Sequence, residues 1–170
     1  MADVVLIHPN RDKAESKATR AAVILLLITS SALIAIITIG GWSQLQGAQI
    51  VAFGYIVIYA VMAFFVARWN RGVLPVAAAL AILFAVVAAV AGPAWFDRDK
   101  EGFDNPLLDP SILGLLTIIL VPVQILLIAF AMRGFQQEWN VEVEVARDEA
   151  EGRVPPPDAP AGGEPSPATS

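Results

Sequence analysis

The sequence predicts an all-α integral membrane protein: an up-down-up-down bundle of four transmembrane helices with both termini on the cytoplasmic side. Three observations lead to this prediction. Four apolar runs of about 20 residues contain no Asp, Glu, Lys, Arg or His. The basic residues collect on one side of these runs, and the tryptophans follow their ends. The chain is 56% hydrophobic, above the roughly 45–50% of soluble domains.

The predicted spans cover residues 21–39, 49–67, 73–92 and 111–132. At about 1.5 Å of rise per residue, a helix of this length crosses a hydrocarbon core about 30 Å thick. Because lipid offers backbone N–H and C=O groups no partners, each run should be helical. The first run starts after a polar stretch and is followed by no Ala-x-Ala site, so we interpret it as a retained span rather than a signal peptide.

These spans define the expected domain organisation. A single membrane domain covers residues 21–133, and the loop at 93–110 faces the external side. A basic segment, 1–20, precedes this domain and can lie along anionic headgroups. A charged, amphipathic segment, 134–153, follows it. The Pro-, Ala- and Gly-rich tail, 154–170, cannot bury a core and is expected to be disordered.

The positions of the charges predict the orientation. Of the eleven basic residues, only Arg98 and Lys100 lie outside if both termini are cytoplasmic. Since Lys and Arg near span ends set topology, this orientation is strongly favoured. The four tryptophans lie at or just beyond span ends, where aromatic rings prefer the interface: Trp42, Trp69, Trp95 and Trp139. The short loops between spans 1 and 2 and between spans 2 and 3 predict antiparallel neighbours.

Uncharged polar residues lie at similar depths in three spans: Ser30, Ser31, Tyr55, Tyr59 and Gln124. A glutamine amide facing lipid would be costly, so Gln124 should point inward towards hydroxyl groups. The structural interpretation is a set of interhelical hydrogen bonds, each worth about 0.6–2 kcal/mol. The alternative is a small polar pocket for a lipid headgroup, a quinone or a substrate.

Small residues recur every four positions in the third span: Ala77, Ala81, Ala85 and Ala89. Such a ladder lets a neighbouring backbone approach closely, and Ala78, Ala88 and Gly92 widen it. The ladder is therefore a candidate packing seam, against either the second span or another protein.

Acidic residues concentrate in the external loop: Asp97, Asp99, Glu101, Asp104 and Asp109. Their spacing matches the start of a calcium-binding loop, but Leu108 stands where the bidentate Glu is required. A solvated acidic surface, available to a basic partner, is the simpler interpretation. At the two ends, Val4–Ile7 is a short apolar patch, and the alternation at 141–145 is too short to predict a strand.

The sequence excludes several classes of chemistry. It has no cysteine, which rules out disulfides and thiolate-ligated metals. No nucleotide-binding or hydrolase motif is found, and no basic face suits nucleic acid. Spans without ionisable groups lack the usual parts of a pump or proton relay. We therefore expect no cofactor, no metal and no catalytic residue.

The resulting expectation is a non-enzymatic multi-pass protein of a bacterial inner membrane. It would be an accessory or scaffold subunit of a larger complex, with a membrane protein or a second copy as partner. The rival is a small transporter or channel subunit that uses Tyr55, Tyr59 and Gln124. A lipid-modifying enzyme is a third option, but no residue at membrane depth can serve as its base or nucleophile.

Overall fold

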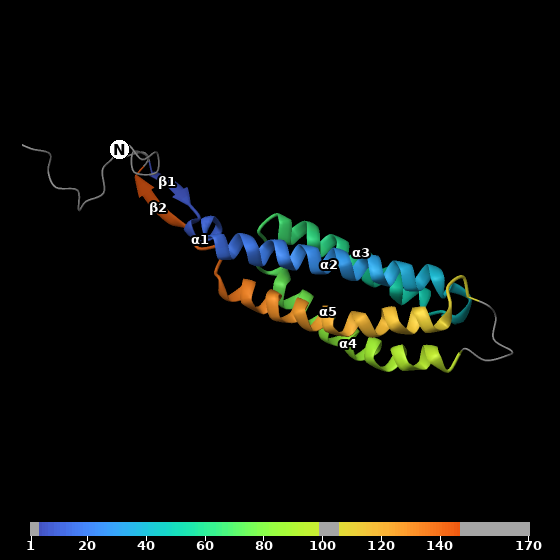
Figure 1. Ribbon diagram of the computed structural model, residues 1–170. Coiled ribbons are helices and arrows are strands. Elements are labelled where there is room, and N and C mark those ends of the chain that lie inside the picture. Colours follow the sequence, from blue (N-terminus) through green and yellow to red (C-terminus); the bar gives the residue numbers. More distant parts are fainter. Residues whose placement is uncertain (1–3, 99–105, 147–170) are drawn as a thin grey trace, which may run out of the picture.

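The computed structural model describes residues 4–98 and 106–146, which form four long helices (Figure 1). These are α2 (Ala14–Gly40), α3 (Gln49–Ala67), α4 (Val73–Phe96) and α5 (Pro110–Gln136). All four are long and apolar enough to cross a membrane, so the prediction of four apolar helices is confirmed. The short elements are β1 (Val4–Ile7), α1 (Pro9–Asp12), the 3-10 helix η1 (Trp42–Gln44) and β2 (Val143–Ala146).

The helices extend beyond the apolar runs that predicted them. α2 begins at Ala14, before the apolar run reaches Ala21, and the extended backbone of Lys13 separates it from α1. α4 continues through Pro93, and α5 continues through Pro122. Each proline removes one N–H donor from its helix without ending it. The longer α2 and α5 therefore include charged residues beyond the apolar runs, such as Arg20 and Arg133.

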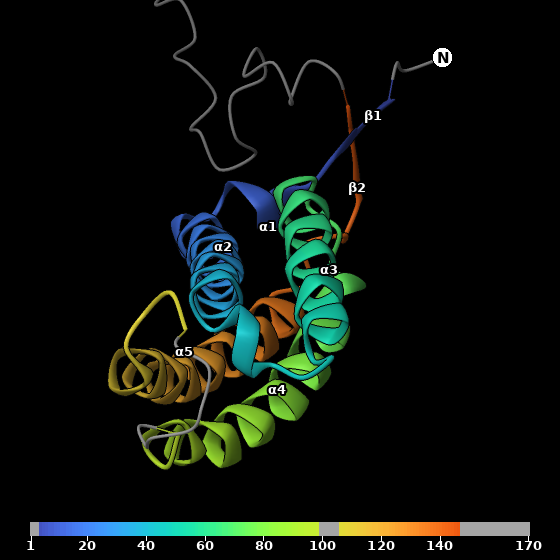
Figure 2. The same ribbon diagram turned by 90° about the vertical axis from the view of Figure 1, so that its right-hand side faces the viewer.

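The chain passes along the four helices in alternating directions (Figure 1), but successive helices do not all pack on one another. α2 packs against α3 and α5, and α4 packs along α5. α3 and α4 touch only sparsely, so the order around the bundle is α3, α2, α5, α4 (Figure 2). The second and third spans, expected to be antiparallel neighbours, do lie next to each other, but they make only sparse contact along their length. A short loop holds two helix ends together but does not set the angle between the helices.

At the end of the bundle away from the ribbon, the α2–α3 connection lies close to the residues that connect α4 and α5. The N–H of Leu108 donates to the carbonyl of Gly40 at 3.1 Å. A Cβ atom on Gly41 would lie 2.5 Å from the ring of Trp95, so a side chain here would displace that tryptophan. These two glycines let the α2–α3 connection lie against the ends of α4 and α5.

The described ends of the chain meet in a two-stranded antiparallel ribbon. β1 pairs with β2, and Val5 is opposite Val145 while Ile7 is opposite Val143. Because alternate residues share a face, these four apolar side chains lie on one side of the ribbon. Residues 4–7 of the N-terminal segment and residues 143–146 of the segment after α5 are thus joined, and the fold departs from all-α at this point. The alternation after α5 was too short to predict a strand without its partner. Residues 154–170, expected to form a tail, lie outside the described residues.

Candidate functional site

The polar residues predicted at mid-membrane converge from three helices. The hydroxyl of Tyr59 on α3 donates to Oε1 of Gln124 on α5, at 2.8 Å. Nε2 of Gln124 donates to Oγ of Ser30 on α2, at 2.9 Å. All three side chains are fully buried, with 0% exposure. The structure therefore places Gln124 at the centre of the bundle, between two hydroxyl groups.

This hydrogen-bonded chain ends on the backbone. Ser30 accepts from Gln124 and donates its own hydroxyl to the carbonyl of Leu26 at 2.8 Å. Each of the three hydrogen-bonded side chains thus has a partner, as buried polar groups require. Three neutral side chains that bond to one another therefore hold α2, α3 and α5 together.

Ser31 and Tyr55 lie beside the hydrogen bonds that link Tyr59, Gln124 and Ser30, but take no part in them. The Ser31 hydroxyl donates to the carbonyl of Ile56 at 3.4 Å, which joins α2 to α3. The ring of Tyr55 contacts Tyr59 edge-on, with centroids 5.6 Å apart, and lies 4.6 Å from the ring of Phe84 on α4. Tyr55 therefore belongs to an aromatic contact between α3 and α4.

The small residues of α4 face α5, but not all members of the predicted ladder do. Ala77 and Ala81 are fully buried, Ala85 is half-buried and Ala89 is exposed. At about 100° per residue, each four-residue step moves a side chain about 40° around the helix. A strict four-residue ladder therefore leaves the interface. The buried seam continues instead through Ala88 and Gly92, and a Cβ on Gly92 would lie 2.7 Å from the Ile118 side chain of α5.

Two apolar hollows mark the side where α3 and α4 touch sparsely. The central cavity, about 160 Å³, lies among all four helices; residues from each that line it are Ile34, Ala52, Ala88, Ala91 and Leu120. The outer groove, about 320 Å³, lies between α3 and α4 near their connection; it is lined by Val57, Ile58, Val61, Phe65, Val73 and Val76. Both hollows suit hydrocarbon rather than polar ligands.

At the end of the bundle near the ribbon, two arginines and two tryptophans form a connected cluster. We call it the arginine–tryptophan cluster; its members are Arg11, Arg20, Trp69 and Trp139. The guanidinium of Arg20 lies 4.5 Å from the centre of the Trp69 ring and donates to carbonyls at the C-terminus of α3. Trp69 contacts the fully buried Trp139 edge-on at 5.4 Å.

Arg11 and Gln137 complete the attachment of α1 and α2 to the end of α5. Nε of Arg11 donates to the carbonyl of Trp139 at 3.0 Å. The indole N–H of Trp139 donates to Gln137, whose amide donates to Thr19 on α2 at 3.1 Å. Sequence reasoning placed these tryptophans at the interface but did not bring them together. The one feature of the sequence that could have predicted the contact between Arg20 and Trp69 is that both lie at span ends on the same side of the bundle.

The acidic loop is described only in part. Asp99, Glu101 and Asp104 lie outside the described residues, whereas Asp97 and Asp109 are exposed. Asp109 caps α5, because its Oδ1 accepts from the N–H of Ser111 at 2.8 Å. Hydrogen bonds from the Ser111 side chain and backbone hold the pKa of Asp109 below its ordinary value. Within residues 4–98 and 106–146, no three His, Cys, Asp or Glu side chains gather as metal ligands.

Compared with protein-family models, with curated proteins and with solved structures, the chain matches none. Its four helices, each long and apolar enough to cross a membrane, suggest a membrane protein.

Proposed function

We propose that this chain is a non-enzymatic accessory or scaffold subunit that packs against a helix of a larger complex in a bacterial inner membrane. The observation that carries the proposal is the face of α3 around Gly54. A Cβ added to Gly54 would meet no atom within 4 Å, so the bundle itself does not use the space that this glycine leaves. One turn further along α3, Val57 and Ile58 begin the outer groove.

Glycine weakens a helix interior, so its place in a span usually reflects a close helix approach. Inside lipid, helices associate by close packing, and small residues permit the shortest distances between backbones. The face formed by Gly54 and the outer groove offers a small residue followed by a shallow apolar channel. A transmembrane helix laid on this face would also cover the side on which α3 and α4 touch sparsely.

The transporter alternative gains no support from the polar layer. Ser30, Tyr59 and Gln124 are fully buried and hydrogen-bonded to one another, and solute would have to break these bonds to pass. The same neutral, mutually satisfied groups supply no acid, base or nucleophile, which favours a role outside catalysis.

The proposed face can be tested with a photo-activated cross-linker placed at Val57 in the full chain, in native membranes. We expect a single adduct with another membrane protein, and Gly54→Leu should remove this adduct while leaving the unfolding transition unchanged. Ala60→Leu is the matched control: Ala60 is also exposed on α3 but lies about 120° around the helix from Gly54. An adduct with a second copy would instead favour a homo-oligomer, and an adduct unaffected by Gly54→Leu would contradict the proposed face.

We further propose that both termini lie in the cytoplasm, on the basis of the distribution of Lys and Arg. Reporter fusions after Pro110 and at Ser170 should report opposite sides of the membrane, with the Ser170 fusion cytoplasmic. A periplasmic signal at Ser170 would reverse the orientation.

A further inference from the structure

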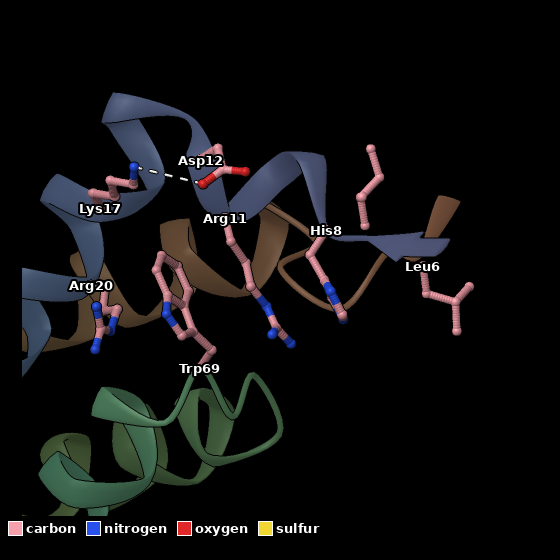
Figure 3. Close-up of a pocket in the computed structure, with 8 residues that line it drawn as sticks. Leu6, His8, Arg11, Asp12, Lys17, Arg20 and Trp69 are labelled. Atoms are coloured by element: carbon pink, nitrogen blue, oxygen red, sulfur yellow. Dashed lines mark ion pairs between the residues drawn. The ribbon is translucent and has the colours of Figure 1, made fainter. Parts of the chain in front are cut away.

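A polar hollow of about 560 Å³ lies where the ribbon, α1 and the start of α2 meet the α3–α4 connection. Its lining includes His8, Arg11, Asp12, Lys17, Arg20 and Trp69. In Figure 3, the Trp69 ring lies between the side chains of Arg11 and Arg20, and these two and His8 extend in a similar direction. Three basic residues and one acid thus give the hollow an excess of positive charge.

The hollow lies at the level of the lipid headgroups. Arg20 is the last charged residue before the apolar run of α2, and Lys17 lies about 4.5 Å further out along the helix. On the facing side, Trp69 is the second residue after the end of α3. Residues at these positions lie at the boundary between hydrocarbon and water, so the hollow is accessible to headgroups of the surrounding leaflet.

The guanidinium groups are positioned by the protein but retain hydrogen-bonding capacity. Arg20 donates from Nε and Nη2 to the carbonyls of Val66 and Ala67, and Arg11 donates from Nε and Nη2 to Trp139 and Asn140. A guanidinium carries five N–H donors, so among the described residues each arginine uses only part of its set. Lys17 makes one long ion pair with Asp12, at 3.7 Å, and both side chains are largely exposed.

We propose that this hollow binds the phosphodiester headgroup of an anionic phospholipid. Arginine forks match phosphate oxygens in geometry, and Lys17 adds a mobile charge at the outer rim. Trp69 holds the Arg20 guanidinium against its ring, which reduces the entropy lost when phosphate binds. The proposal depends on membrane insertion alone and is independent of the accessory-subunit function.

The test uses the full chain in a neutral detergent, with phosphatidylglycerol as the probe and phosphatidylcholine as the comparison. Bound lipid is counted by native mass spectrometry. An exposed ion pair contributes up to about a fivefold gain in affinity, so removing the pair between Lys17 and the bound phosphate with Lys17→Gln should weaken phosphatidylglycerol binding by up to about fivefold. Removing the acid with Asp12→Asn should strengthen it.

Arg133→Gln is the matched control. Arg133 lies at the same end of the bundle, its side chain is 59% exposed against 57% for Lys17, and it makes one ion pair of 3.8 Å. It does not line the hollow. A much smaller effect of Arg133→Gln supports a discrete site, whereas equal losses would show diffuse surface attraction and overturn the proposal. Equal binding of phosphatidylcholine, or full competition by inorganic phosphate at the same concentration, would overturn the assignment to an anionic lipid.

Discussion

Helices α4 and α5 pack closely although a long connection separates them, whereas α3 and α4 touch sparsely although their connection is short. The difference lies in the side chains. Between α4 and α5 the buried residues include Ala77, Ala81 and Gly92, and an added Cβ on Gly92 would collide with Ile118. Between α3 and α4 the outer groove is lined by valines, Ile58 and Phe65.

In lipid, loop length is therefore a weaker guide to packing than residue size. A short connection brings the ends of α3 and α4 together, but in the outer groove beside that connection the lining residues are bulky, and the two helices are not closely packed there. Small residues allow the close approach from which dispersion forces gain most. The comparison predicts that the same Ala→Leu substitution will be costly on the α5 side of α4 and nearly neutral on the α3 side.

The largest effect is expected where α4 meets α5. Ala81→Leu adds bulk at a position with 0% exposure, and overpacking of this kind costs about 1–3 kcal/mol of unfolding free energy. The measurement is reversible unfolding in mixed micelles. Ala79→Leu is the control, since Ala79 is exposed on the same helix. Equal tolerance at both positions would contradict a close α4–α5 interface.

The next effect concerns the hydrogen bonds that link α2, α3 and α5. Gln124→Leu removes its bonds to Tyr59 and Ser30, each worth about 0.6–2 kcal/mol in a membrane, and should lower the unfolding free energy accordingly. A double-mutant cycle with Tyr59→Phe should give a coupling energy of about 0.6 kcal/mol. Additive losses from the two variants would show that these side chains do not interact in the membrane.

A smaller effect is expected on the α3–α4 side of the same helix. Ala91 lines the central cavity, so Ala91→Leu places its added bulk in space that the bundle leaves open. We expect a change within about 0.5 kcal/mol of unfolding free energy, in either direction. If Ala91→Leu were as costly as Ala81→Leu, α4 would be tightly packed on both sides and the comparison would fail.

The smallest effect concerns the start of α5. Asp109 supplies a side-chain cap to this helix, whereas no side-chain cap bond is found at the starts of α2, α3 and α4. The folded state lowers the pKa of Asp109, so the ionised carboxylate stabilises the fold. This contribution is complete above the unfolded-state pKa of about 3.9, and it is lost as pH falls through the lower pKa of the folded state. Unfolding measured against pH should show this small acid loss in the native chain and not in Asp109→Asn, which retains an acceptor.

The amino-acid sequence was sufficient to predict four apolar helices, their approximate positions and the inward direction of Gln124. Each follows from a local rule: uncharged runs of about 20 residues must be helical in lipid, and a buried amide must find partners. The helix ends were harder to predict. The largely polar stretch Ala14–Arg20 continues α2 before the apolar run, and no change in hydropathy at Ala14 marks the start of the helix.

Which helices touch could not be predicted from the sequence and became clear from the folded arrangement. Ala89 continues the alanine ladder in sequence but lies on the exposed face, because a four-residue spacing drifts around a helix of 3.6 residues per turn. The pairing of Val4–Ile7 with Val143–Ala146, and the meeting of Arg20 with Trp69, join residues far apart in the chain. Such contacts depend on how the helices are arranged around the bundle, which the pattern within each helix does not contain.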